Sequence, residues 1–167
     1  QSIVKDLFSG VFILLDDQYN VGDDVIINSI SGSVLAINMR NTQIQGYDGS
    51  VNTISNGSIT TVTNFSKGNQ RSVVTFCFPV DVDVEKIKKI ISTYSIEFTE
   101  KNDSVIKAPE FFGVTEIQSY YIKIAVSLWS KQSTQWNNEK NLREELYKKF
   151  KEENIEFLKL EKGDIIV

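Results

Sequence analysis

The sequence predicts a mixed α+β protein with three parts, which are an amphipathic N-terminal helix, a small all-β domain and a larger domain of strands and helices. Three observations lead to this prediction. The chain begins with apolar residues at helical spacing, continues with short β-branched segments separated by Gly and Asn, and then alternates between strand-like and helix-like periods. We place the three parts at residues 1–17, 18–68 and 69–167.

Residues 1–17 have the periodicity of an amphipathic helix. At about 100° per residue, the apolar side chains cover roughly half of the helical wheel. They are Ile3, Val4, Leu7, Phe8, Val11, Phe12, Leu14 and Leu15. The opposite side of the wheel carries Ser2, Lys5, Asp6 and Ser9. So wide an apolar face has to be covered by protein or by lipid.

The shape of this helix leaves two interpretations open. It is either an ordinary amphipathic helix packed on a globular core, or the end of a membrane segment that emerges at the lipid–water boundary. A rise of about 1.5 Å per residue gives it a length of about 20 Å, less than the hydrocarbon core of about 30 Å. We therefore expect that it does not cross a membrane by itself. Because the chain begins with Gln1, we also expect residues upstream.

Residues 18–68 contain short apolar segments at close spacing, namely DDVIIN, GSVLAINMR, TQIQGY, SVNTIS and SITTVTNF. We predict the breaks between strands at Ser31-Gly32, Asp48-Gly49 and Asn56-Gly57. Asp-Gly and Asn-Gly between β-branched runs are strong hairpin signals, because both residues tolerate positive φ. Five such strands predict a small closed or sandwiched β unit of the Sm- or SH3-like kind.

Residues 69–167 alternate between strands and helices. The predicted elements are a strand over 71–79, a helix that begins at Asp83, strands over 110–117 and 120–129, a helix over 134–153 and a last strand over 155–160. Asp83 is a good N-cap, because its carboxylate can accept a hydrogen bond from the first helical turn. The order is the ferredoxin-like βαββαβ plan. That plan hosts many functions and alone predicts none.

Composition and charge exclude several classes of function. Residues 1–68 hold three basic residues against six Asp, the reverse of a nucleic-acid-binding surface. The chain has no His, which removes Ser–His–Asp and Cys–His catalysis and the usual zinc sites. Its one cysteine, Cys77, can form no internal disulfide. Asp81, Asp83 and Glu85 are better explained as a helix N-terminus than as a cation site. We predict no enzyme activity, cofactor, metal site or nucleic-acid partner.

Short motifs follow one another in a specific order along the first part of the chain. The helix and its exit carry Asp6-Leu7, Ser9-Gly10, Phe12-Ile13-Leu14-Leu15 and Tyr19-Asn20-Val21-Gly22-Asp23-Asp24-Val25. The β unit carries Gly32-Ser33-Val34, Ile37, Arg40-Asn41-Thr42, Asp48-Gly49, Asn56 and Asn64-Phe65-Ser66. In this order and spacing they resemble the MscS family, the mechanosensitive channels of small conductance. Residues 69–167 resemble the family mainly by their order of strands and helices.

The resemblance implies a channel that opens under membrane tension and releases ions and small osmolytes on hypo-osmotic shock. Residues 2–15 would be the second half of its pore-forming helix, and the membrane helices would precede Gln1. The chain would then form the cytoplasmic vestibule of a homo-heptamer in the cell inner membrane. Upstream helices and residues 2–15 would contact the lipid bilayer, and ions and small solutes would pass through side openings.

The resemblance also singles out residues by position. In the pore helix and its hinge these are Leu7, Phe8 and Gly10. In the β domain they are Gly22, Asp23, Gly32, Arg40 and Asn56. A glycine inside a helix costs about 1 kcal/mol relative to alanine, and Gly10 would let helices approach closely or bend. Gly22 would allow a sharp exit from helix to strand. The chain departs from the family at Ser55, where Pro is usual, and at its end, IEFLKLEKGDIIV.

Two other classes of function remain open. A soluble module with a small β barrel and a ferredoxin-like domain could bind a protein or a small ligand without being a channel. It would stay monomeric without detergent, with the first helix buried on its own chain. RNA binding through the β unit is disfavoured by its acidic charge, and RNA retention that depends on salt would revive it.

Overall fold

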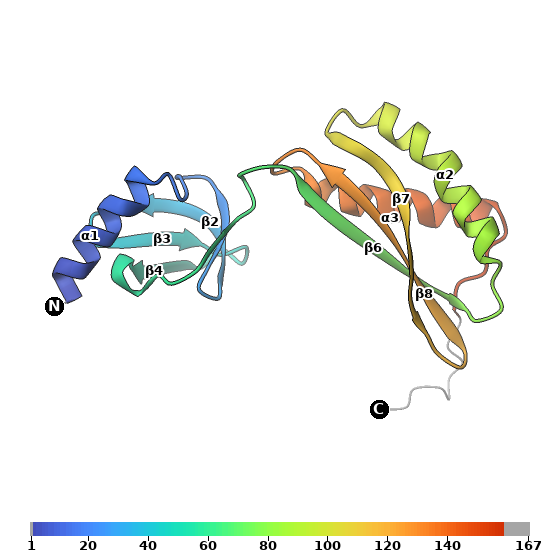
Figure 1. Ribbon diagram of the computed structural model, residues 1–167, viewed down its shortest axis with the longest axis horizontal. Coiled ribbons are helices and arrows are strands. Elements are labelled where there is room, and N and C mark those ends of the chain that lie inside the picture. Colours follow the sequence, from blue (N-terminus) through green and yellow to red (C-terminus); the bar gives the residue numbers. More distant parts are fainter. Residues whose placement is uncertain (1, 159–167) are drawn as a thin grey trace. The chain divides into compact units, whose positions relative to one another are not determined.

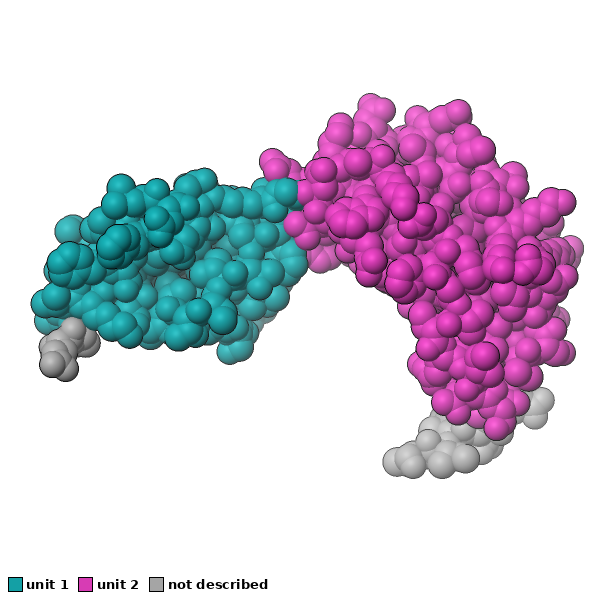
Figure 2. Space-filling model, in the orientation of Figure 1, with its two compact units in different colours: residues 1–68 teal, residues 69–167 magenta. Residues whose placement is uncertain are grey.

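The computed structural model describes residues 2–158, and the chain divides into two compact units, residues 1–68 and residues 69–167 (Figure 2). We call them unit 1 and unit 2. Each has its own hydrophobic core.

Unit 1 consists of one helix and one antiparallel sheet (Figure 1). Helix α1 spans Ser2–Leu15 and packs against a short 3₁₀ helix, η1, at Asn56–Ser58. The strands lie in the order β4-β3-β2-β1-β5. They are β1 (Asp24–Ile27), β2 (Ile30–Ile37), β3 (Asn41–Gln45), β4 (Val51–Ser55) and β5 (Val62–Asn64). Inward side chains alternate with outward ones, as a sheet with one covered face requires.

The core of unit 1 is small and aliphatic. Its members are Ile13, Tyr19, Val25, Ile27, Val34, Ile44 and Ile54. Only Ile13 comes from α1, and Tyr19 comes from the loop that follows it. The helix therefore contributes little apolar area to this core.

One of the three predicted breaks in the β unit is wrong, and the other two are confirmed. The first hairpin turns at Asn28-Ser29, where Asn28 has φ of 56°, and Gly32 lies inside β2. The break at Asn56-Gly57 is confirmed, since β4 ends at Ser55, but the short helix η1 begins there instead of a two-residue hairpin. The break at Asp48-Gly49 is confirmed, with Gly49 at φ of 86°. Asn tolerates the left-handed region almost as a turn glycine does, which is why the first turn needs no Gly.

Unit 2 is a three-stranded antiparallel sheet with two helices. The elements are β6 (Gln70–Pro79), α2 (Val84–Lys101), β7 (Val105–Ile117), β8 (Tyr121–Ser130) and α3 (Gln135–Glu152). The strand order is β6-β8-β7. Asp83 caps α2 as predicted, since its side chain accepts a hydrogen bond from the Lys86 amide at 3.0 Å. Strand β7 begins earlier than predicted and has several register shifts against β8.

One face of this sheet is covered by both helices. Alternate residues of β6 and β8 are buried with the apolar sides of α2 and α3. The core they form includes Phe78, Ile91, Ile124, Leu146 and Phe150. Mixed α+β architecture is thus confirmed in both units.

The predicted last strand falls partly outside the described residues. Positions 155–158 are not a strand, although the Leu158 amide donates to the Cys77 carbonyl at the outer edge of β6, at 3.4 Å. Phe157 instead stacks on Phe78, with ring centroids 5.2 Å apart. Residues 159 and 160 lie outside the range that the structure describes.

Candidate functional site

The apolar face of α1 is exposed. Seven large apolar side chains of this helix have between 47% and 73% of their surface exposed, namely Ile3, Val4, Phe8, Val11, Phe12, Leu14 and Leu15. Leu7 is half-buried. Within the described part of unit 1, residues 2–68, no other element covers this face. The interpretation that it packs on the protein's own core is therefore wrong, and the face needs another partner.

A different, narrow stripe of α1 packs on the β unit. It consists of Asp6, Gly10 and Ile13, spaced about one turn apart and all buried. The Asp6 carboxylate accepts a hydrogen bond from the Gly57 amide at 3.0 Å. Asp6 was predicted on the polar side of the wheel, but it faces the protein here, whereas Lys5 on the same side is exposed.

Gly10 lies where the helix meets the backbone of unit 1. A Cβ atom at this position would lie 2.4 Å from the Met39 carbonyl oxygen and 2.6 Å from the Asn56 side-chain nitrogen. Only glycine permits so close an approach of helix and loop. The same argument applies to Gly57, where a Cβ atom would lie 2.6 Å from the Asp6 carboxylate. These two contacts join α1 to η1.

Asn56 is the centre of a buried polar network beneath this contact. Its side-chain nitrogen donates to the carbonyls of Asn38 (3.0 Å) and Met39 (3.2 Å). Its side-chain oxygen accepts from the Thr42 hydroxyl at 2.9 Å. The Thr42 oxygen lies 2.8 Å from the Tyr19 hydroxyl. Since the one Thr42 proton is engaged with Asn56, Tyr19 donates to Thr42, and burial raises the pKa of Tyr19.

This network explains three residues that the sequence singled out or missed. Asn56 is 1% exposed and holds the Met39 loop in the position against which Gly10 packs. Tyr19 and Thr42 were not predicted as site residues. Both lie inside the short motifs that carry the resemblance, Tyr19 at the start of the helix exit and Thr42 directly after Arg40-Asn41, and this was the signal that could have singled them out. Each buried side-chain polar atom of this network has a hydrogen-bond partner. The contact between α1 and the β unit, which we call the joint, is therefore rigid.

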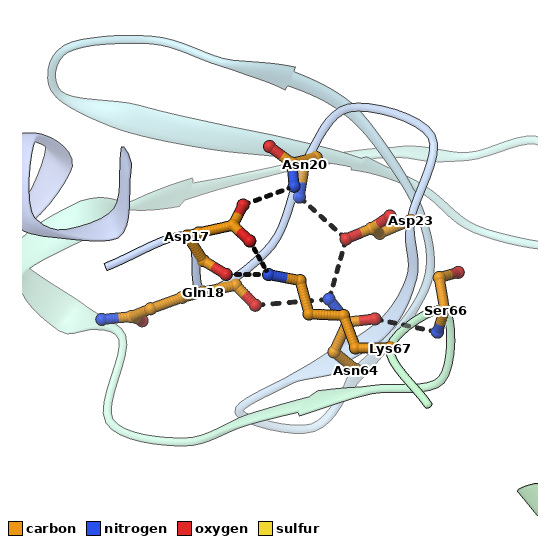
Figure 3. A network of polar contacts seen from close by, with 7 residues as sticks. All are labelled: Asp17, Gln18, Asn20, Asp23, Asn64, Ser66 and Lys67. Atoms are coloured by element: carbon orange, nitrogen blue, oxygen red, sulfur yellow. Dashed lines mark hydrogen bonds and ion pairs between the residues drawn. The ribbon is translucent and has the colours of Figure 1, made fainter. Parts of the chain in front are cut away.

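The exit from α1 is a polar loop held to the end of β5 (Figure 3). Gly22 has φ of 93°, and its amide donates to the Val34 carbonyl at 2.8 Å, which turns the chain into β1. The Asp23 carboxylate accepts from the Asn20 amide at 2.9 Å and from the Asn64 side chain at 2.8 Å. Gly22 therefore supplies the turn and Asp23 fixes it.

The remaining two β-domain residues act through their backbones. A Cβ atom at Gly32 would lie 2.2 Å from the Gln45 carbonyl oxygen, so glycine allows β2 and β3 to come together. Arg40 has an exposed side chain, and its carbonyl accepts from the Asn56 amide at 2.9 Å. The structure thus brings Gly10, Arg40 and Asn56 together, whereas Gly32 and Phe8 lie apart from that contact.

Other surfaces of the described chain offer less specific chemistry. A groove of about 470 Å³ lies between α2 and α3, and three Lys and three Glu side chains take part in its lining. At its floor, burial and a hydrogen bond to Glu145 raise the pKa of Tyr94. Within the described residues, no group of three metal-binding side chains is found. None of the helices described is long and apolar enough to span a bilayer.

Comparison with known families returns channel domains over most of the chain. Residues 2–67 match the pattern described as "Mechanosensitive ion channel, beta-domain". Residues 72–157 match the pattern described as "Mechanosensitive ion channel MscS, C-terminal". The boundary between the two matches falls where units 1 and 2 meet along the chain.

Two relatives with functional names are similar over most of this chain. A small-conductance mechanosensitive channel of Caldanaerobacter subterraneus subsp. tengcongensis is 38% identical over 94% of this chain and 56% of its own length. A moderate conductance mechanosensitive channel of Escherichia coli K12 is 27% identical over 81% of this chain and 19% of its own. The chain therefore spans about half the length of the first relative, and much less of the second.

The fold is also that of a solved channel structure. The crystal structure of Helicobacter pylori MscS in the closed state superposes with a TM-score of 0.76. The alignment covers 98% of this chain and 65% of that one, at 20% sequence identity. The likeness shows the fold of this chain, with a helix, a β unit and a βαββα unit following one another along the sequence.

Proposed function

Because the chain belongs to the MscS family of mechanosensitive ion channels, we propose that it is part of a channel that opens under membrane tension. The channel would release ions and small osmolytes when external osmolarity falls suddenly. In this proposal the chain forms the vestibule on the cytoplasmic side of the cell inner membrane. Its copies assemble as a homo-oligomer, a heptamer by family resemblance.

The observation that carries the proposal is the two-sided character of α1. Its apolar face is open, with Phe8 at 63% and Leu15 at 73% exposed. Its narrow opposite stripe is fixed to the β unit through Asp6 and Gly10. A helix of this kind can contact lipid or sister subunits on one side while its own β unit holds it on the other.

Movement of the membrane part would then reach the β unit through the Gly10 contact. Gly10 packs on the Met39 carbonyl, and Asp6 is bonded to Gly57. A shift of α1 along its axis either breaks these contacts or moves the β unit together with the helix, because a close-packed contact does not deform gradually. In this proposal, glycine stands at position 10 because it lets α1 approach the β unit closely, and not because it lets the helix bend.

The proposal is tested by patch clamp of the full-length protein in liposomes. We expect currents that begin at a threshold of applied suction. Phe8→Gln removes an apolar side chain from the open face, and we expect it to shift that threshold. Ile96→Gln is the matched control, because Ile96 on α2 is also 63% exposed. It is expected to leave the threshold unchanged.

Two results would contradict the proposal. One is a full-length protein that passes no current at any suction below membrane rupture. The other is a protein that stays monomeric without detergent and has α1 covered by its own chain, which would favour a soluble binding module.

A further inference from the structure

The turn that directly follows α1 is bound to the end of unit 1 by an ion pair. The Lys67 ammonium donates to the Asp17 carboxylate at 2.6 Å and also to the Asp17 main-chain carbonyl (Figure 3). Lys67 directly precedes Gly68, the last residue of unit 1, from which the chain passes to unit 2. The pair therefore joins the end of the helix to the start of the connection between units.

Asp17 occupies a helix-end position that normally favours glycine. The Gln18 amide donates to the Ile13 carbonyl at 3.1 Å, and the Asp17 amide donates to the Leu14 carbonyl at 3.4 Å. These two bonds define a Schellman end, in which Asp17 takes the left-handed position with φ of 50°. Glycine is the residue best suited there. A carboxylate is also unfavourable at the negative end of the helix dipole.

The side-chain contacts of Asp17 offset both disadvantages. Besides Lys67, the Asn20 side chain donates to the Asp17 carboxylate at 2.7 Å. The hydrogen bond from Lys67, and then that from Asn20, hold the pKa of Asp17 below its ordinary value. Asp17 is therefore stabilised at this position by its contact with Lys67, and not by its backbone conformation.

The other bridges between the same two segments do not join opposite charges. The Asn64 side chain donates to the Gln18 carbonyl at 3.2 Å and to Asp23, while its oxygen accepts from the Ser66 amide at 2.8 Å. Asp17 and Lys67 alone supply opposite charges, with 67% and 38% of their side chains exposed. Salt weakens such an exposed pair, because the Debye length falls from about 10 Å at 0.1 M to about 3 Å at 1 M and so approaches the separation of the two charges.

We propose that Asp17 and Lys67 form an ionic clasp that couples the end of α1 to the connection with unit 2, and that rising ionic strength loosens it. At low ionic strength the clasp holds the last turn of α1. At high ionic strength the hydrogen bonds of the Asn64 side chain remain, but the ion pair is weaker and the last turn of α1 opens more often. Where gating is the readout, the inference rests on the proposed channel function, and the clasp then makes the tension threshold depend on salt.

The first test is hydrogen exchange of peptides that cover residues 10–20 in the full-length protein, at about 0.05 M and about 0.5 M KCl. We expect exchange in the wild type to be about 1.5- to fivefold faster at high salt, the range that loss of an exposed ion pair supports. Asp17→Asn keeps a side chain that tolerates the left-handed backbone. It is expected to exchange at the fast rate in both salts.

Two further variants separate the clasp from general stability. Lys67→Gln is expected to behave like Asp17→Asn, and Lys67→Arg to restore the salt dependence. Lys101→Gln is the matched control, because it breaks an exposed pair with Glu97, also 2.6 Å long, in unit 2. It is expected to leave residues 10–20 unchanged. Equal, salt-independent exchange in the wild type and Asp17→Asn would overturn the clasp.

The second test is the suction threshold of the same proteins at the two salt concentrations. We expect a threshold that moves with KCl in the wild type and in Lys67→Arg, and one that does not move in Asp17→Asn. If exchange responds to salt while every threshold stays fixed, the coupling to gating is wrong. A protein without any suction-activated current rejects the channel function, and exchange still decides the clasp.

Discussion

Helices α2 and α3 in unit 2 are packed in the usual way, whereas α1 in unit 1 is not. In unit 2, the apolar faces of both helices lie on the sheet, and Ile91, Leu142 and Leu146 are at most 1% exposed. In unit 1, a stripe containing a carboxylate and a glycine faces the protein, and the apolar side chains face outward. An amphipathic pattern therefore shows which face of a helix needs a partner, but it does not show that the same chain provides that partner.

The largest effect that tests this comparison is on stability. Leu146→Ala empties a fully buried position, and we expect it to lower the free energy of unfolding by about 2 to 5 kcal/mol. Leu15→Ala removes a side chain that is 73% exposed and should change it by less than about 0.5 kcal/mol. Urea unfolding followed by circular dichroism checks both. A loss at Leu15 as large as that at Leu146 would show that α1 is covered by its own chain.

Gly10→Ala tests the narrow stripe of α1. The added Cβ atom would lie 2.4 Å from the Met39 carbonyl oxygen, and we expect a loss of about 1 to 3 kcal/mol from the strain of overpacking. The better helix propensity of alanine offsets about 1 kcal/mol of this. In the full-length channel, the same variant should alter gating or inactivation in patch-clamp traces.

The neighbouring variant Ser9→Ala serves as the control for Gly10→Ala. Ser9 is half-buried on the same helix, and alanine improves its helix propensity. It should be neutral or slightly stabilising, with unchanged gating. If Gly10→Ala also leaves stability and traces unchanged, the close contact with the Met39 loop has no mechanical role.

The smallest effect concerns an exposed carboxylate that is paired with a lysine. In unit 2, Glu116 accepts from Lys123 and Tyr121, both at 2.5 Å, and these contacts lower its pKa from 4.5 to about 2. The folded pKa lies below the unfolded one, so the stabilisation is complete above pH 4.5 and is lost as the pH falls towards 2.

A carbon-detected NMR titration of the Glu116 carboxyl group measures this shift. The β7–β8 hairpin should loosen only in that acidic range, and Glu116→Gln should remove this part of the pH dependence. An ordinary pKa for Glu116 would show that the hairpin contacts do not persist in solution.

Much of the architecture could be predicted from local patterns. The helical period of α1, the N-cap at Asp83 and the Asp48-Gly49 turn depend on residues close together in the chain, and the structure contains all three. The Asn28-Ser29 turn was missed because asparagine replaces glycine in the left-handed region. The start of β7 was missed because register shifts against β8 interrupt its alternation.

The joint between α1 and the β unit could be predicted only in part. Gly10, Asn56 and Arg40 were singled out by motif, but their contact was not. Asp6 was assigned to the solvent-exposed face of the helix, since a carboxylate among polar neighbours usually lies on that face. It is buried because the Gly57 amide, 51 positions away, is directed at it. No local pattern contains that information.

The sequence alone determined the order of helix, strands and helices, the family, and the need of the apolar face of the first helix for a partner. These follow from periodicity, capping and motif order, which act over a few residues. Only the tertiary structure decided which face of α1 the chain keeps for itself, and that Lys67 reaches Asp17. Such contacts join segments that are distant in the chain, so patterns that act over a few residues do not contain them.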